Sequence, residues 1–163
     1  MKHLLALILL FSCFINSTFA SEQENLIQLS PLTLEMADGS QLKTAELLGT
    51  PYILHFWATW CPYCKKLQPG LEKIHQKYKR HGFRVIGVSF REDDDATPQQ
   101  SLINRGHHFK TAIKADLIAQ QLGVKGTPTT LFINKQGQVV WLTITSDPDD
   151  KKLHDYAAKL VSD

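Results

Sequence analysis

Apolar and polar positions alternate near the start of the chain and then give way to one long apolar run. Residues 32–36 alternate as a strand does, Asp38-Gly39 is a turn pair, and 41–43 can return as the second arm of a β-hairpin. The nearly continuous apolar run 52–58 is rich in β-forming residues, as in a central strand that is covered on both faces. We therefore predict a leading hairpin followed by the middle strand of a sheet.

The segment that follows has the periodicity of an amphipathic helix. Its apolar positions recur at spacings of three and four: Cys64, Leu67, Leu71, Ile74 and Tyr78. Gly82 ends this helix, and residues 83–90 form the next apolar strand. A strand, a helix and a second strand within about forty residues indicate a right-handed crossover between parallel strands. At least part of the sheet should therefore be parallel.

The rest of the chain adds further helices and strands. In chain order we predict an acidic loop at 91–97, helices at 98–104 and 115–122, strands at 129–134 and 138–143, and a helix at 149–161. A short turn at 135–137 lets the two strands pair antiparallel, and Thr97 is placed to cap the first helix. Residues 21–28 are mostly polar and are predicted to be a loose leader. The sum is an α/β fold with a mixed central sheet and helices on both faces.

Composition limits the chain to one domain and argues against nucleic acid. Of its 163 residues 43% are hydrophobic, which is enough for one compact core. Lys and Arg total 18 against 16 Asp and Glu, and the basic residues form no long run that could follow a phosphate backbone. Nucleic acid is therefore not expected among the partners.

The first twenty residues have the layout of a secretory signal. Lys2 and His3 precede the apolar run 4–11, and the stretch closes on the small residue Ala20. The apolar part is shorter than the roughly 20 residues that span a bilayer as a helix. We predict a signal peptide at 1–20, a single domain at 21–163 and export to the periplasm. A lipid anchor at Cys13 is the alternative, which the bulky residue two positions before that cysteine fits badly.

Two cysteines separated by two residues, Cys61 and Cys64, carry the candidate chemistry. A disulfide between them closes so small a loop that it would stabilise the fold little. A zinc site would need two more ligands, and the chain has no second cysteine pair. Covalent haem attachment would need His after the second cysteine, where Lys65 stands. Redox chemistry remains, and the redox-active disulfide itself requires no cofactor and no bound metal.

The position of the pair between the central strand and the helix assigns each cysteine a role. Cys61 falls at the start of the helix, where free backbone N–H groups and the helix dipole stabilise a thiolate. We therefore predict that Cys61 is the nucleophile and that Cys64, one turn further on, is the resolving thiol. Pro62 fixes the first turn without removing a needed N–H, and Tyr63 can present its ring beside the exposed sulfur.

The amino-acid sequence around this cysteine pair resembles that of the thioredoxin superfamily. The segment 56–65 reads FWATWCPYCK, Pro69 follows eight residues after the first cysteine, and Gly126-Thr127-Pro128-Thr129 precedes a strand that ends in a turn at 134–137. With the signal and the leading hairpin, the chain is similar to the TlpA/ResA/CcmG-like periplasmic thiol:disulfide oxidoreductases. The resemblance covers roughly residues 32–160 and implies a thioredoxin fold with an N-terminal β-hairpin extension.

The resemblance implies further site residues. Pro128 should follow a cis peptide bond beside the cysteines, and the backbone of Thr127 should pair with an extended substrate segment.

His55 stands on the central strand where ordinary thioredoxins have a buried acid, so it is a candidate proton acceptor; a structural histidine satisfied by the backbone is the alternative. Glu92 matches an active-site glutamate of ResA-like members, the alternative being a solvated acid in the run 92–95. Apart from the resemblance, Trp60 is expected to pack as a shield beside the sulfurs, since large aromatic side chains next to strands are usually packing residues.

We therefore expect an exported enzyme that exchanges disulfides with protein substrates. The resemblance implies a reductant, with a role in cytochrome c maturation and a membrane electron donor as a second partner. A periplasmic thiol oxidant is one alternative, because His55 replaces a carboxylate that would oppose thiolate formation. The other alternative is a copper-delivering module on the same fold, with His107 or His108 as the third ligand beside the cysteines; otherwise both histidines should lie on the surface. A monomer is expected.

Overall fold

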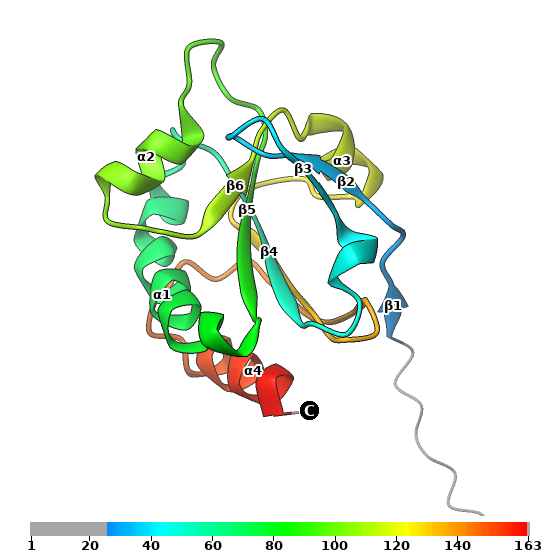
Figure 1. Cartoon of the computed structure of the whole chain (residues 1–163). Coiled ribbons are helices and arrows are strands. Elements are labelled where there is room, and N and C mark those ends of the chain that lie inside the picture. Colours follow the sequence, from blue (N-terminus) through cyan, green and yellow to red (C-terminus); the bar gives the residue numbers. More distant parts are fainter. Residues whose placement is uncertain (1–25, 163) are drawn as a thin grey trace, which may run out of the picture.

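The computed structural model describes residues 26–162, and it places a six-stranded mixed sheet at the centre of the molecule (Figure 1). The strand order is β1-β8-β7-β4-β5-β6, so β4 lies near the middle, as predicted. The predicted signal peptide at 1–20 and the lipid-anchor alternative at Cys13 lie outside the described residues. Of the helices that the structure describes, none is long and apolar enough to cross a membrane.

The strands of this sheet combine both pairing directions. Their bounds are β1 Ile27–Gln28, β4 Tyr52–Trp57, β5 Arg84–Ser89, β6 Lys110–Ala112, β7 Thr129–Ile133 and β8 Gln138–Thr143. The β4·β5 and β5·β6 pairs are parallel, whereas β1·β8, β7·β8 and β4·β7 are antiparallel. The parallel β4·β5 pair flanks the crossover through the first long helix, as the sequence predicted.

Helices cover both faces of the sheet (Figure 1). Their bounds are α1 Pro62–Tyr78, α2 Pro98–Asn104, α3 Asp116–Gln121 and α4 Lys151–Ser162, with single 3-10 turns η1 Thr44–Leu47 and η2 Lys79–His81. The apolar sides of α1 and α4 share one core cluster with Ile53 and Trp57 of β4. Leu54 and Phe56 point the other way, into a second cluster with the hairpin and α3. The predicted α/β thioredoxin fold is confirmed.

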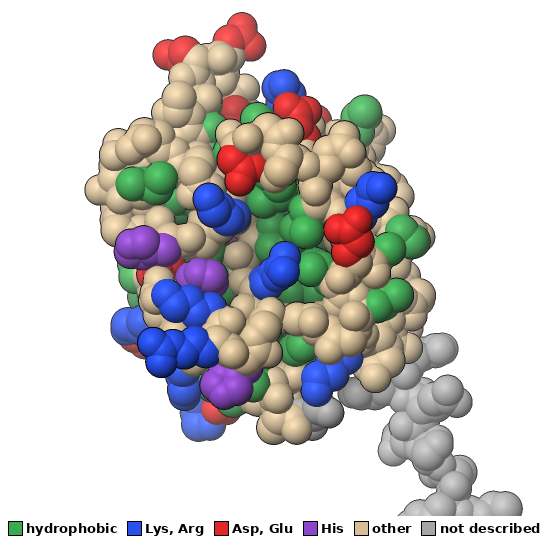
Figure 2. Space-filling model, viewed as in Figure 1, with side chains coloured by type: hydrophobic (Ala, Val, Ile, Leu, Met, Phe, Trp, Pro, Cys, Tyr) green, Lys and Arg blue, Asp and Glu red, His purple; other side chains and the backbone are tan. Residues whose placement is uncertain are grey.

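The N-terminal hairpin is a separate two-stranded sheet that lies over the second core cluster. It consists of β2 Thr33–Glu35 and β3 Gln41–Lys43, in antiparallel register with Leu34 opposite Leu42. A single bridge between Met36 and Ala112 links it to the main sheet. The cleft between the hairpin, β5 and the end of α1 holds about 460 Å³, and Figure 2 shows its apolar floor with basic side chains around it.

Two short strands depart from the sequence prediction. Ile27–Gln28 was expected in a loose leader, yet it pairs with β8 as β1. Lys110–Ala112 was not expected as a strand and forms β6 on the far edge, beside β5. Segments of two or three residues show no hydrophobic period of their own, so their pairing is decided by the strand they lie against.

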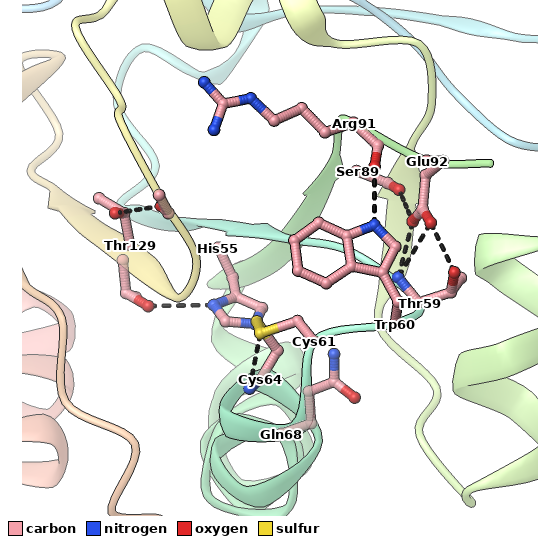
Figure 3. Close-up of a disulfide and its surroundings, with 12 residues drawn as sticks. His55, Thr59, Trp60, Cys61, Cys64, Gln68, Ser89, Arg91, Glu92 and Thr129 are labelled. Atoms are coloured by element: carbon pink, nitrogen blue, oxygen red, sulfur yellow. Dashed lines mark hydrogen bonds between the residues drawn. A yellow bond between two sulfur atoms is a disulfide. The ribbon is translucent and has the colours of Figure 1, made fainter.

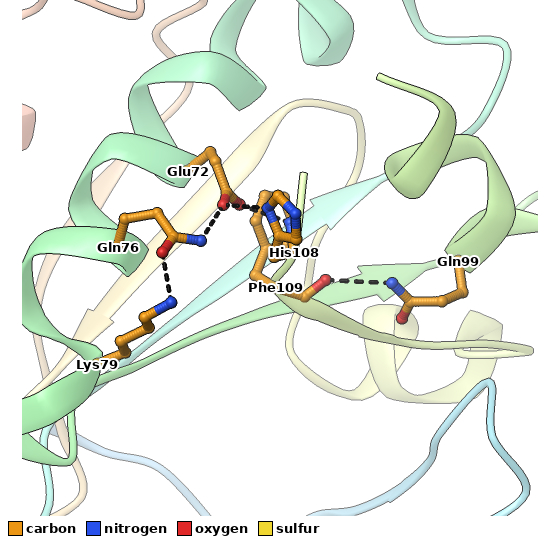
Figure 4. A network of polar contacts seen from close by, with 6 residues as sticks. All are labelled: Glu72, Gln76, Lys79, Gln99, His108 and Phe109. Atoms are coloured by element: carbon orange, nitrogen blue, oxygen red, sulfur yellow. Dashed lines mark hydrogen bonds and ion pairs between the residues drawn. The ribbon is translucent and has the colours of Figure 1, made fainter. Parts of the chain in front are cut away.

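Two predictions about polar side chains also need correction. Thr97 lies at the N-cap of α2, but its side chain makes no capping hydrogen bond. His107 was expected on the surface, yet it is 5% exposed and stacks on Phe109. Its neighbour His108 is exposed as predicted, and its backbone and ring nitrogens contact the Glu72 carboxylate at 2.8 and 2.9 Å (Figure 4). The turn after α2 thus buries one histidine against Phe109 and leaves the other in solvent beside Glu72 of α1.

Candidate active site

The two cysteines lie at the N-terminus of α1 and form a disulfide. Cys61 is the N-cap residue and Pro62 is the first residue of the helix, so the sharp turn out of β4 places the pair at the helix start. The backbone N–H of Cys64 donates a hydrogen bond to Cys61 Sγ over 3.1 Å. This N–H would stay directed at Cys61 Sγ after reduction and would stabilise a thiolate there, in addition to the helix dipole.

Access to the disulfide is restricted. Cys61 is 1% exposed and Cys64 is fully buried, while Pro62 and Tyr63 between them are exposed. Trp60 is half exposed, and its indole N–H donates to the carbonyl of Arg91 over 2.7 Å, which holds the ring over the loop next to the sulfurs (Figure 3). A partner would therefore reach Cys61 across the rim formed by Trp60 and Tyr63.

An open groove of about 690 Å³ begins at Tyr63 and runs along the loop before β7. Thr127 and Pro128 line it, and the peptide bond between them is cis, as the resemblance implied. Three apolar side chains on its walls are strongly exposed, namely Tyr63 at 63%, Leu142 at 55% and Ile144 at 72%. Exposed apolar side chains that gather along a groove are typical of a binding surface for another chain.

His55 lies inside the protein, on the face of β4 that α1 covers. Because side chains alternate along a strand, His55 shares this face with Ile53 and Trp57. The ring is fully buried, its Nδ1 lies 3.0 Å from Thr130 Oγ1, and its Nε2 has no hydrogen-bond partner among residues 26–162. Burial lowers the pKa of His55 to about 3, so the ring is neutral at pH 7. The Nδ1 partner is a threonine side chain and not the backbone of the structural alternative.

Glu92 is tied to the loop that precedes the cysteines. Its carboxylate accepts the backbone N–H of Thr59 at 2.8 and 3.0 Å, together with the hydroxyls of Thr59 and Ser89. The alternative of a merely solvated acid is therefore wrong for Glu92, although Asp93–Asp95 beside it are exposed. Figure 3 shows these bonds on the far side of Trp60 from the disulfide, so the carboxylate acts on the backbone before Cys61.

These bonds predict a measurable cost for Glu92→Gln. The amide keeps the size but puts an N–H group against neighbours that are themselves donors. We expect the free energy of unfolding to fall by about 1–3 kcal/mol, since buried donors lose their acceptor. Urea unfolding monitored by tryptophan fluorescence measures this value. The matched control Asp94→Asn changes an exposed acid of the same loop, and an equal stability of both variants would contradict the role of Glu92.

No group of three or more His, Cys, Asp or Glu side chains within residues 26–162 is arranged to hold a metal ion. His107 packs against Phe109, and His108 contacts Glu72. Both histidines are thus engaged on the turn after α2. The copper alternative required one of them as a third ligand beside the cysteines, and this arrangement is not found in the described part of the chain.

Several residues around the disulfide were not singled out from the sequence. Thr130 faces His55 because β7 pairs with β4 in the register His55 opposite Thr130. Leu142 and Ile144 reach the groove only through the fold. Gln68 is buried on α1 one turn after Cys64. The sequence could have indicated it, because it is a polar residue on the apolar face of the predicted helix.

Comparison with known protein families shows to which family this chain belongs. The Redoxin family model matches residues 22–160. The chain belongs to the Redoxin family. The thiol-disulfide oxidoreductase ResA of Halalkalibacterium halodurans is 33% identical over 108 residues, which cover 66% of this chain and 61% of that protein. ResA of Bacillus anthracis is 32% identical over 126 residues, or 76% of this chain and 71% of that protein. The chain thus spans about three fifths of the first relative.

Solved structures of similar proteins agree with the fold. A Chlorobium tepidum protein provisionally described as the thiol:disulfide interchange protein DsbE matches with a TM-score of 0.72 at 26% identity, over 83% of this chain and 96% of that chain. A secreted thiol-disulfide isomerase from Corynebacterium glutamicum matches with a TM-score of 0.74 at 22% identity, over 83% and 86% of the two chains. The TlpA/ResA/CcmG-like resemblance is therefore confirmed, and this Redoxin chain has the fold and the cysteine pair of a thiol:disulfide oxidoreductase.

Proposed function

We propose that this protein is an exported enzyme that exchanges disulfides with other proteins through Cys61 and Cys64. The observation that carries the proposal is the disulfide at the start of α1, next to Tyr63, where an open groove of about 690 Å³ begins. The ResA relatives are named for this activity. The charged, apolar and small residues at 1–20 support export, and two of the similar structures are of proteins described as secreted.

In the reductive direction the chemistry has two steps. The Cys61 thiolate attacks one sulfur of the substrate disulfide, which forms a mixed disulfide and releases the other substrate sulfur as a thiolate. Cys64, after losing its proton, then attacks Cys61 Sγ, which closes the Cys61–Cys64 disulfide and releases the second substrate thiolate. Two electrons pass from the protein to the substrate. His55 is the proposed transient acceptor of the Cys64 proton: in the tautomer whose Nδ1–H donates to Thr130 Oγ1, Nε2 keeps a lone pair and has no partner among residues 26–162.

Substrate binding follows from the groove. An extended segment on either side of the substrate cysteine would pair with the backbone of Thr127, as in the addition of a strand, while its side chains rest on Tyr63, Leu142 and Ile144. Backbone pairing reads no particular side chain, so a range of protein substrates is expected. We further propose that the enzyme acts as a monomer and that the Cys61–Cys64 disulfide carries the redox chemistry without an added cofactor.

The favoured direction is reduction, with electrons supplied by a membrane donor and use in cytochrome c maturation. The resemblance to the TlpA/ResA/CcmG-like group favours this direction, and the similarity to proteins named ResA supports that resemblance. Oxidation of exported thiols is the second candidate, because a neutral histidine in place of a buried carboxylate opposes thiolate formation less.

The reduction potential of the purified protein distinguishes these two directions. Equilibration with a series of glutathione or dithiothreitol ratios gives this value. We expect about −250 mV or lower, the range of thioredoxin-like reductants. A value near −120 mV, roughly that of strong periplasmic oxidants, would assign the second candidate instead. Failure of the pair to equilibrate with either buffer would contradict thiol:disulfide exchange altogether.

A further inference from the structure

Gln68 is a buried polar side chain next to the disulfide, and only the oxygen of its amide group makes a hydrogen bond within residues 26–162. The side chain is 0% exposed, and its Nε2 group has no hydrogen-bond partner among residues 26–162. Gln68 follows Cys64 by one helical turn, and helical side chains lean toward the N-terminus, so its amide lies on the cysteine side of α1 (Figure 3). A buried donor without an acceptor is costly, which calls for an explanation.

Arg105 decides which end of this amide faces the cysteines. Its guanidinium donates a hydrogen bond to Gln68 Oε1 over 2.9 Å and lies 5.6 Å from the centre of the Trp57 ring. Arginine has donors and no acceptor, so only the oxygen of Gln68 can face it. The N–H₂ group is therefore turned away from Arg105. Arg105 forms no ion pair with any acid in the described residues, and no carboxylate competes for it.

We propose that Gln68 stabilises the Cys64 thiolate in the resolving step: once the disulfide opens, the free N–H₂ group of Gln68 donates a hydrogen bond to the sulfur of Cys64. Arg105 is the positioning residue that keeps this group turned toward the sulfur. The proposal rests on the proposed thiol:disulfide exchange and adds two residues to it. A disulfide sulfur is a weak acceptor, whereas a thiolate is a charged one, so the bond forms in the reduced protein. The orphaned donor of the oxidised protein is thus accounted for.

In the described part of the chain, no charged side chain near the disulfide takes over the stabilisation of the Cys64 thiolate from Gln68. Figure 3 shows His55 of β4 beside the disulfide, and Arg105 from the segment after α2 contacts Gln68. Apart from the transient proton transfer, the ring of His55 is neutral at pH 7, so it brings no lasting positive charge to the sulfur. Glu92 is directed at Thr59. Gln68 therefore stabilises the thiolate that remains after proton transfer.

Single-turnover kinetics with a chromogenic aromatic disulfide test the proposal. The reduced protein releases one coloured thiolate when Cys61 attacks the reagent and a second when Cys64 resolves the mixed disulfide. We expect Gln68→Met, which keeps the shape and removes the donor, to slow the second release about tenfold and leave the first unchanged, because the Cys64 thiolate loses one charge-assisted bond. Gln68→Glu, which keeps an acceptor for Arg105 but has no donor, should slow it at least as much. The control Gln100→Leu, an exposed glutamine on α2, should change neither release.

A double-mutant cycle tests the positioning role of Arg105. Arg105→Met should slow the second release, and the variant with both substitutions should be no slower than Gln68→Met, because Arg105 acts through Gln68. Additive effects would overturn the role of Arg105. Unchanged resolution in both Gln68 variants, or equal slowing of both releases, would overturn the role of Gln68. The reagent is not a protein, so failure to reduce insulin with two intact releases would overturn only the proposed function.

Discussion

Cys61→Ser should reduce the rate of insulin reduction to the uncatalysed background, a loss of about three orders of magnitude or more. Cys61 carries the only sulfur that receives a backbone N–H at the helix start within the described site, and it adjoins the exposed Pro62-Tyr63 rim. A serine hydroxyl there is not ionised at pH 7 and cannot attack a disulfide. The turbidity of reduced insulin, with dithiothreitol as electron donor, measures this rate.

Cys64→Ser should behave differently, because it removes the second step and leaves the first. Cys61 can still attack, so the substrate stays attached as a mixed disulfide. A covalent complex should be visible on a non-reducing gel and should disappear on treatment with dithiothreitol. Wild-type protein alkylated at both cysteines is the control and should form none. Full activity of either variant, or a stable complex with Cys61→Ser, would contradict the assignment of the two roles.

The second large effect is expected in the dependence of stability on pH, and His55 is its source. The ring is fully buried and keeps a pKa of about 3 in the folded protein, whereas an unfolded histidine has a pKa near 6.5. Above pH 6.5 neither state binds the proton, and His55 has no effect. Between pH 6.5 and 3 only the unfolded state binds it, so folding loses up to about 1.4 kcal/mol for each unit by which the pH falls.

Urea unfolding at several pH values between 7 and 4 measures this loss. The variant His55→Asn retains a polar side chain that does not titrate, so its stability should fall less steeply than that of the wild type. The difference between the two slopes isolates His55 from the other groups that titrate in this range. The matched control His81→Asn replaces an exposed histidine and should have the slope of the wild type. Parallel curves for the wild type and His55→Asn would show that the ring is protonated in the folded state.

Much of this molecule follows from local pattern. The unbroken apolar run gave β4, the spacing of apolar residues gave α1, and the turn before β8 gave the antiparallel pair. The cysteine pair at the start of α1 was predictable for the same reason, since its neighbours in the sequence are also its neighbours in the helix. Hydrophobic periodicity is a property of neighbouring residues, so it is readable without the fold.

Other features depend on strands that meet only in the folded chain. β1 and β6 are too short to show a period, and each forms because a longer strand offers it an edge. The partner of His55 is Thr130, 75 residues away, and the register of β7 on β4 brings the two together. The sequence could place His55 on the central strand, but its fully buried environment and neutral ring required the tertiary structure.

The sequence by itself determined the redox pair, its helix start, the family and the order of most elements, because these are set by residues close together in the chain. Only the tertiary structure decided that Glu92 holds the backbone of Thr59, that Leu142 and Ile144 extend the groove from Tyr63, and that Arg105 turns the amide of Gln68. Each of these contacts joins segments that are 20 or more residues apart, and their geometry depends on how the sheet and α1 pack together.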